Sequence, residues 1–211
     1  MSRQTPPPIP AAKREQILTA ALEVFVSNGY VGTSTDQLAA AATVSKQTLY
    51  RAFGDKRGIF TALIRSVCDH VNDPFAPLVS RMREVTDPHD ALDLLADRFT
   101  ASILTPANQR LRRLVIAEAA RFPELGRLYW ESGFERMLTS IGQCLSVLDD
   151  RGLLSVPHPA LAAEHFAGLL LWIPGNRGMF LGTEPPLDGE QVRRDITEGV
   201  AAFLRAYRTR E

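Results

Sequence analysis

Apolar residues recur along most of the chain at helical spacing, and the period-two alternation that indicates β-strands is almost absent. The first clear stripe consists of Ile17, Leu18, Ala21, Leu22 and Phe25. This spacing places all five side chains on one face of a helix. The pair Asn28-Gly29 is typical of a left-handed helix end, so the first helix is predicted over 11–28. The pattern as a whole predicts an all-α fold.

Proline positions separate the later helices. No proline lies within 11–73, and those that follow fall mostly where a helix could begin or bend. The remaining long helices are predicted over 56–72, 75–85, 89–104, 107–121, 123–150, 158–181 and 189–208. The 158–181 segment is apolar nearly throughout, which predicts that it is buried on most sides. Four prolines stiffen the leader over 1–10, which we expect to be disordered.

Two short helices are predicted directly after the first helix. The segment that contains them reads GYVGTSTDQLAAAATVSKQTLYRAFGDKRGIF. Ser34, with a glutamine three residues later, forms a capping-box pattern that starts a helix over 35–42. After a tight turn, Ser45 can cap a second helix over 46–53. Two short helices joined by such a turn and braced by a longer helix are typical of the helix-turn-helix.

The second short helix carries polar side chains near its N-terminus, where a recognition helix reaches base edges in the major groove. Gln47 can pair with adenine and Lys46 with guanine, and the methyl group of Thr48 can contact thymine. Nearby hydroxyl and amine donors are placed to contact phosphates. The predicted DNA-binding residues are Ser34, Thr35, Ser45, Lys46, Gln47, Thr48, Tyr50, Arg51 and Lys56. The alternatives are a solvated helix face for this group and, for Tyr50 and Lys56, packing against the first helix.

The charge distribution supports contact with a polyanion. The 211 residues carry 24 basic and 24 acidic side chains, so the net charge is zero. The first 65 residues, however, hold eight basic against four acidic side chains, and the rest hold 16 against 20. A basic head on an acidic body favours nucleic acid as a partner, although a solvated surface explains it equally well. Arg3, Lys13 and Arg14 suggest a minor-groove arm, with a polar leader as the alternative.

Composition and motif searches argue against catalysis, metals and membranes. The histidines, His70, His89, His158 and His165, lack the spacing of metal ligands. No nucleophile, phosphate-loop or metalloprotease motif is present, so no catalytic residue, metal or cofactor is predicted and the chain is not expected to be an enzyme. Two cysteines and the absence of a secretory signal favour the cytoplasm. The longest apolar run is too short to span a membrane.

The helix-turn-helix segment closely resembles the DNA-binding domain of the TetR/AcrR family of bacterial transcriptional regulators. The residues that match the family pattern in order and without a gap are Gly29, Tyr30, Thr33, Ser34, Leu38, Ala39, Ala42, Val44, Ser45, Thr48, Leu49, Tyr50, Phe53, Lys56 and Ile59. Further along, RLVIAEAARFPELGRLYWESG is similar to the AefR-like C-terminal domain of some members. One position departs from the pattern: Thr43 stands where the family usually has glycine. Because a β-branched residue adopts positive φ at a cost, we expect either another turn geometry or a longer preceding helix.

The resemblance implies a DNA-binding domain over 11–56 and a larger domain over 57–211 that binds a ligand and a second subunit. It implies a homodimer joined by a four-helix bundle from 158–181 and 189–208. The function expected is that of a repressor that binds a palindromic DNA operator and leaves it when a small-molecule effector binds. The helix over 56–72 would transmit the signal. The rival interpretations are a small-molecule-binding protein whose DNA-binding head is vestigial and a helical enzyme.

A ligand pocket in the larger domain would be mostly apolar with a few polar groups. The candidate ligand-binding residues are Phe99, Ile103, Glu118, Phe122, Tyr129, Phe134, His165 and Trp172. For each of them, plain core packing is the alternative. The two cysteines, Cys68 and Cys144, are expected to be small buried apolar residues, with a redox-sensor role as the alternative.

Overall fold

The structure is a computed structural model that describes residues 9–72, 75–181 and 189–209. These residues form helices and loops with no strand among them, which confirms the predicted all-α fold. The helical elements are α1 (Ala11–Gly32), α2 (Thr35–Ala41), α3 (Lys46–Phe53), α4 (Lys56–Asn72), α5 (Ala76–Arg81), α6 (Pro88–Ile103), α7 (Pro106–Ala119), α8 (Pro123–Tyr129), the π-helix η2 (Trp130–Glu135), α9 (Arg136–Asp150), α10 (Pro159–Phe180) and α11 (Gly189–Tyr207). Most of the predicted leader, including Arg3, lies outside the described residues.

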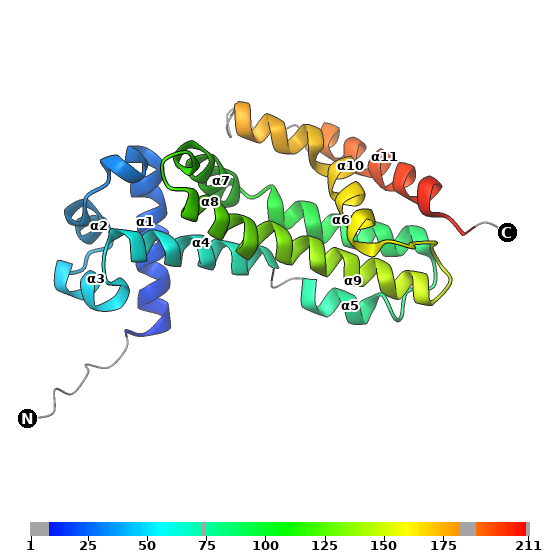
Figure 1. Cartoon of the computed structure of the whole chain (residues 1–211), viewed down its shortest axis with the longest axis horizontal. Helices are drawn as coiled ribbons and strands as arrows, with labels where there is room; N and C mark the ends of the chain where they lie inside the picture. The colour runs from blue at the N-terminus through cyan, green and yellow to red at the C-terminus, as the bar shows by residue number, and fades with distance from the viewer. Residues whose placement is uncertain (1–8, 73–74, 182–188, 210–211) are drawn as a thin grey trace, which may run out of the picture.

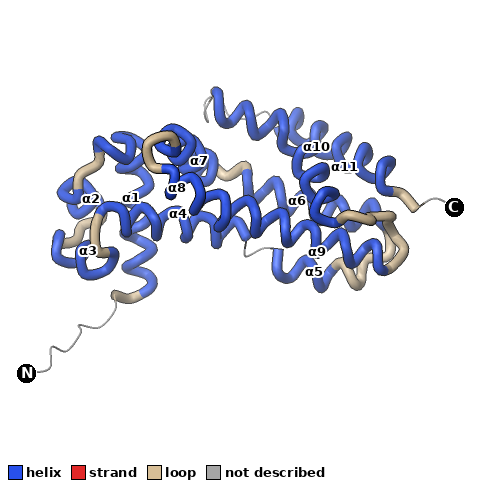
Figure 2. The backbone as a smooth tube through the Cα atoms, in the orientation of Figure 1, coloured by secondary structure: helices blue, strands red, loops and turns tan. Residues whose placement is uncertain are grey.

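The described helices form an elongated molecule with α1, α2 and α3 at one end (Figure 1). α4 runs from this end into the body, and α10 and α11 lie side by side along the far part of the molecule. The connecting loops are short compared with the helices (Figure 2). The three N-terminal helices are therefore presented at one tip, with α4 as their continuous covalent link to the body.

Two apolar cores hold the molecule together. The first joins α1–α4 with α7 and α8, and in it the rings of Phe25 and Phe60 meet edge to face at 4.8 Å between centroids. The second joins α5, α6, α9, α10 and α11, where Phe166 and Phe203 meet at 5.1 Å. α7 and α8 thus pack with the N-terminal helices, so the apolar cores do not divide at residue 56, where the sequence suggested a domain boundary.

α1 forms as predicted and buries its apolar stripe. The chain kinks at Gly29, whose φ of +70° is readily adopted only by glycine. The prediction that the helix ends here was right about the glycine, but helical structure resumes for a further turn to Gly32. The kink places the buried ring of Tyr30 against Phe25 and Phe60. It therefore fixes the direction in which the chain enters α2.

The two short helices begin at the predicted caps. The Ser34 hydroxyl accepts from the Gln37 backbone N–H at 3.2 Å, and the Gln37 side chain accepts from the Ser34 N–H at 2.7 Å, which completes the capping box. The Ser45 hydroxyl accepts from the Thr48 N–H at 3.1 Å. Thr43 itself adopts the left-handed conformation, with φ +52°. The expectation of another turn or a longer helix was wrong, because threonine takes the glycine conformation despite its steric cost.

The predicted helix over 123–150 is continuous but not uniform. α8 passes into η2 and then into α9 without a loop, so the segment contains one π-helical stretch. Gly133 of η2 packs on α4, where a Cβ atom would lie 3.2 Å from the Cys68 sulfur. A π-helix accommodates an additional residue in a helix, which sequence periodicity does not reveal.

α5 is shorter than predicted, ending at Arg81 instead of residue 85. The Arg151 guanidinium donates to the carbonyl oxygens of Met82, at 2.6 Å, and Val85. Carbonyl groups at the end of a helix need such partners, and here a side chain from a distant segment supplies them. The chain can therefore leave the helix early and turn toward α6.

α10 is not buried on most sides in the single chain, contrary to the prediction. Its inner face, with Phe166 and Leu170, packs in the second core. Its outer face leaves Trp172 70% and Phe180 83% exposed, and other large apolar side chains on this helix are also exposed. The reason is geometric, since α10 lies at the outside of the bundle and its neighbours cover only one side.

Candidate nucleic-acid interface and ligand-binding residues

α3 is anchored by one side and presents the other to solvent. Leu49 is buried in the first core, whereas Lys46, Gln47 and Arg51 are exposed. The Tyr50 ring is 49% exposed. Thr48 is half-buried, so Lys46, Gln47 and Arg51 are the side chains of this helix that are open to a long ligand such as duplex DNA. The helix itself lies at the tip of the molecule (Figure 1).

Neighbouring side chains orient this surface. The Thr35 and Tyr50 hydroxyl groups lie 3.3 Å apart, which links α2 to α3. Lys46 forms an ion pair with Asp36. The Ser45 and Thr48 hydroxyl groups lie 2.9 Å apart at the start of α3. Exposed ion pairs of this kind contribute little to stability and exchange readily for other anions, so Lys46 remains available to a phosphate or base.

Lys56, predicted to contact a phosphate or to pack against the first helix, makes internal contacts in the single chain. Its ammonium donates to the carbonyl oxygens of Tyr30 (2.9 Å), Val31 (3.3 Å) and Thr33 (2.9 Å). It also lies 4.8 Å from the centre of the Tyr30 ring. An ammonium has three N–H donors, and all three have a carbonyl partner here. The residue ties the end of α1 to the start of α4.

Two of the N-terminal basic residues also contact the fold. The Arg14 guanidinium lies 4.5 Å from the centre of the Phe53 ring and donates to the Ala52 carbonyl at 3.4 Å. The Lys13 ammonium donates to the Gln16 side chain at 3.2 Å. Arg14 therefore braces α1 against α3, which favours packing over a minor-groove arm for this residue.

A junction of specific contacts joins α1 to α7 and the loop after it. Glu23 and Arg110 form a bidentate ion pair with distances of 2.7 and 2.8 Å. The Glu118 carboxylate accepts from the Tyr30 backbone N–H at 3.0 Å. The rings of Tyr30 and Phe122 meet edge to face at 4.9 Å. Glu118 and Phe122, predicted as ligand-binding residues, thus hold the N-terminal helices on the body.

Three other ligand candidates surround a small internal cavity. Ile103, Tyr129 and Phe134 line it with Asn108, and its volume is about 10 Å³, space for no more than one water molecule. The Tyr129 hydroxyl donates to the Asn108 side chain at 3.0 Å. Burial raises the pKa of Tyr129 well above its ordinary value, so the phenol stays neutral. Core packing therefore describes these side chains in the structure.

The last three candidates lie apart from one another. Phe99 is fully buried in the second core. The His165 ring contacts the Tyr207 hydroxyl at 2.6 Å, and Trp172 lies on the exposed face of α10. The structure therefore does not bring the eight predicted ligand residues into one pocket.

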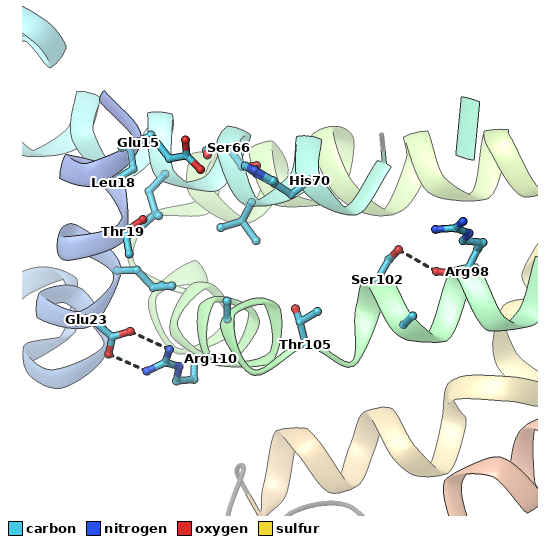
Figure 3. A pocket seen from close by; sticks show the side chains of 15 residues that line it. Glu15, Leu18, Thr19, Glu23, Ser66, His70, Arg98, Ser102, Thr105 and Arg110 are labelled. Atoms are coloured by element: carbon cyan, nitrogen blue, oxygen red, sulfur yellow. Dashed lines mark hydrogen bonds and ion pairs between the residues drawn. The ribbon is translucent and has the colours of Figure 1, made fainter. Parts of the chain in front are cut away.

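A larger cleft, which the sequence did not reveal, lies between α1, α4, α6 and the start of α7 (Figure 3). Its volume is about 500 Å³. We call it the interdomain cleft; its apolar walls are formed by Leu18, Leu22, Leu63, Val67, Ala101 and Ala107. No local sequence signal could have identified it, because its walls come from four segments that only the tertiary fold brings together.

Other features of the described residues concern metal ligands, thiols and membrane-spanning helices. Among them, no group of three histidine, cysteine or acidic side chains is arranged to hold a metal ion. Cys68 and Cys144 are buried thiols, and burial raises the pKa of each to about 12, which keeps them protonated and unreactive. In the part of the chain that the structure describes, no helix is long and apolar enough to cross a membrane.

A capped pair of short helices with an exposed second helix, carried on a larger helical body, defines the class of helix-turn-helix transcriptional regulators. Comparison with known families agrees. Residues 17–63 match the bacterial regulatory proteins of the tetR family, and residues 90–209 match the C-terminal domain of AefR-like transcriptional repressors. The chain therefore belongs to the TetR family of transcriptional regulators, in the group with an AefR-like C-terminal domain.

Known proteins similar to this chain are regulators. A TetR-family regulator from Mesorhizobium loti has a solved structure that is 38% identical, with 99% of this chain and all of that chain covered and a TM-score of 0.86. The flavonoid-responsive regulator FrrA is 27% identical over 96% of this chain and all of its own, with a TM-score of 0.72. The transcriptional activator FasR of Mycolicibacterium smegmatis is 33% identical over 41% of this chain. That match covers 38% of FasR, so the chain aligns with little more than a third of this curated relative.

Proposed function

We propose that the chain is a sequence-specific repressor that binds a palindromic DNA operator as a homodimer in the cytoplasm and is released by a small-molecule effector. The observation that carries the proposal is the exposed face of α3, where Lys46, Gln47 and Arg51 project from a helix fixed by Leu49 and by the cap at Ser45. Side chains held in this way can be matched to base edges in a major groove.

The exposed face of α10 supports the homodimer. Its large apolar side chains form a patch of the kind that marks a protein–protein interface. The exposed members are Leu161, Leu169, Trp172, Ile173 and Phe180. Pairing of α10 and α11 with their symmetry mates would give an isologous four-helix bundle. The two α3 helices of such a dimer need to lie about 34–36 Å apart to enter successive major grooves.

The junction between α1 and α7 supports control by an effector. The Glu23–Arg110 ion pair and the Glu118–Tyr30 hydrogen bond set the angle of the N-terminal helices relative to the body. A ligand that binds one angle better than another shifts the population of conformers and hence the separation of the α3 helices. The effector signal therefore passes to the N-terminal helices through α7 as well as α4, whereas the sequence suggested α4 alone. The similar regulator FrrA is flavonoid-responsive, which supports ligand control of this chain.

The proposal is tested by fluorescence anisotropy with a duplex that the protein selects from a random pool, titrated across salt concentrations. We expect tight binding with a steep negative dependence on salt. Gln47→Ala should weaken binding by about 1–3 kcal/mol and relax the base preference at one position of the half-site. Arg83→Ala, which changes an exposed side chain far from α3, is the control. Failure to select any duplex would favour a ligand-binding protein with a vestigial DNA-binding head.

A further inference from the structure

We propose that the interdomain cleft binds an aliphatic monocarboxylate and that this ligand sets the angle of the DNA-binding helices; the regulatory part of this inference rests on the proposed function. The cleft is far larger than the cavity beside Tyr129, with about 500 Å³ against about 10 Å³. Sites for small molecules usually have volumes of 300–1,000 Å³. The interdomain cleft is thus large enough for an effector, and the internal cavity is not.

The walls of the cleft point to an aliphatic ligand body. Leu18 and Leu22 of α1 and Leu63 and Val67 of α4 line it with aliphatic side chains, and the small side chain of Ala101 lines it from α6. No phenylalanine, tyrosine or tryptophan lies among the residues that line the cleft. Flat aromatic ligands gain from stacking on such rings, whereas an alkyl chain needs only branched aliphatic contact.

The charges of the cleft point to a carboxylate and to its orientation. Arg98 is exposed, and no acidic side chain among the described residues lies within ion-pair distance of it. Arg110 is already occupied by Glu23. Glu15 lies at the opposite end of the cleft from Arg98 (Figure 3). An anionic group is therefore attracted toward Arg98 and repelled from Glu15, which directs the alkyl chain toward α1.

The position of the cleft explains how its occupant could act on DNA binding. One wall belongs to α1 of the DNA-binding unit, and the opposite wall belongs to α6 and α7 of the body. The Glu23–Arg110 ion pair is part of the same lining, so the occupant lies beside the contact that fixes the angle between the two parts. A ligand that prefers a wider or narrower cleft changes this angle directly.

The test uses the full-length protein, decanoate as the probe and decan-1-ol as its uncharged match, with binding measured by isothermal titration calorimetry. We expect both to bind, decanoate more tightly. Arg98→Gln should weaken the binding of decanoate about tenfold, because one charge-assisted hydrogen bond is lost. It should leave the binding of decan-1-ol unchanged. Ala101→Trp fills the cleft from an exposed position on α6 and should abolish binding of both. Arg83→Gln, a matched loss of charge far from the cleft, should change neither.

Operator binding in the same samples separates this inference from the proposed function. We expect decanoate to release the selected duplex from the wild type and from Arg83→Gln, and to have no effect on Ala101→Trp. A protein that binds the duplex but not decanoate, or whose Ala101→Trp variant binds decanoate normally, overturns the cleft inference alone. Binding of decanoate at the cleft with no change in duplex affinity overturns its regulatory part. A protein that binds decanoate as expected but selects no duplex overturns the proposed function and leaves the cleft as a binding site.

Discussion

At the scale of single residues, Lys56 shows how a basic residue in a DNA-binding motif can hold the fold together. Its ammonium bonds to three carbonyl oxygens at the end of α1, one of them 2.9 Å away at Thr33. Sequence spacing predicted a phosphate contact for this lysine, but it could not reveal that the carbonyl groups after the kink at Gly29 lie within hydrogen-bond distance of its ammonium. The direction of a backbone carbonyl depends on the tertiary path, which a motif does not encode.

Lys56→Gln should therefore lower the stability of the protein. Loss of a charged donor shared by three carbonyls should reduce the free energy of unfolding by about 2 kcal/mol. Arg57→Gln, the loss of an adjacent exposed charge, should leave it within about 0.5 kcal/mol of the wild type. Urea denaturation followed by circular dichroism measures both. Equal stability of the two variants would contradict the internal role of Lys56.

Thr43 provides a second test at this scale. It has φ +52°, a conformation that costs a β-branched residue about 1–2 kcal/mol and glycine almost nothing. Thr43→Gly should stabilise the protein by up to about 1 kcal/mol, since the greater freedom of glycine in the unfolded chain offsets part of the gain. Thr43→Ala retains the Cβ atom and should gain less. A thermal melt in which Thr43→Gly is less stable than Thr43→Ala would rule out backbone strain at this turn.

At the scale of helices, the sequence predicted most of the features that depend only on neighbouring residues. Helix caps such as Ser34 and Ser45 depend on neighbours within three residues, and both formed as expected. The early end of α5 depends on Arg151, which is far away in the sequence. The eight ligand candidates failed to form one pocket for the same reason, since apolar periodicity separates inside from outside but does not distinguish a filled core from a cavity.

The outer face of α10 yields a prediction for the oligomer. Trp172→Glu places a charge at a side chain that is 70% exposed in the single chain, so the fold of the monomer should tolerate it. In a dimer joined through α10, the charge would be buried and the interface disrupted. Light scattering during gel filtration should report a dimer for the wild type and a monomer for Trp172→Glu. Val31→Glu, at an exposed apolar residue far from α10, should remain dimeric; a dimeric Trp172→Glu would place the interface elsewhere.

At the scale of the whole molecule, the two buried thiols predict how stability depends on pH. The Cys144 thiol has a pKa of about 12 in the folded chain against 9.0 as its ordinary value, because burial disfavours the thiolate. Between these values the unfolded chain binds fewer protons than the native one, so the free energy of unfolding falls as pH rises. The loss approaches about 1.4 kcal/mol per pH unit for each such thiol.

Denaturation curves between pH 8 and pH 11 measure this slope. Cys144→Ala removes one of the titrating groups and should flatten the decline, whatever its effect on stability at pH 8. Val147→Ala, a comparable truncation on the same helix without a titrating group, is the control. If the slope is unchanged in Cys144→Ala, this thiol does not cause the decline in stability with rising pH.

The π-helical stretch at Trp130–Glu135 has a consequence for changes in chain length. Each residue of an α-helix advances the chain by about 100° around the axis, so one deletion normally rotates every later side chain away from its partners. Within η2 the additional residue is already absorbed, and removal of one residue there would restore ordinary α-helix on both sides without turning the buried face of α9. The long rod from α8 to α9 therefore contains one place where descendants of this gene can lose a codon and keep their fold.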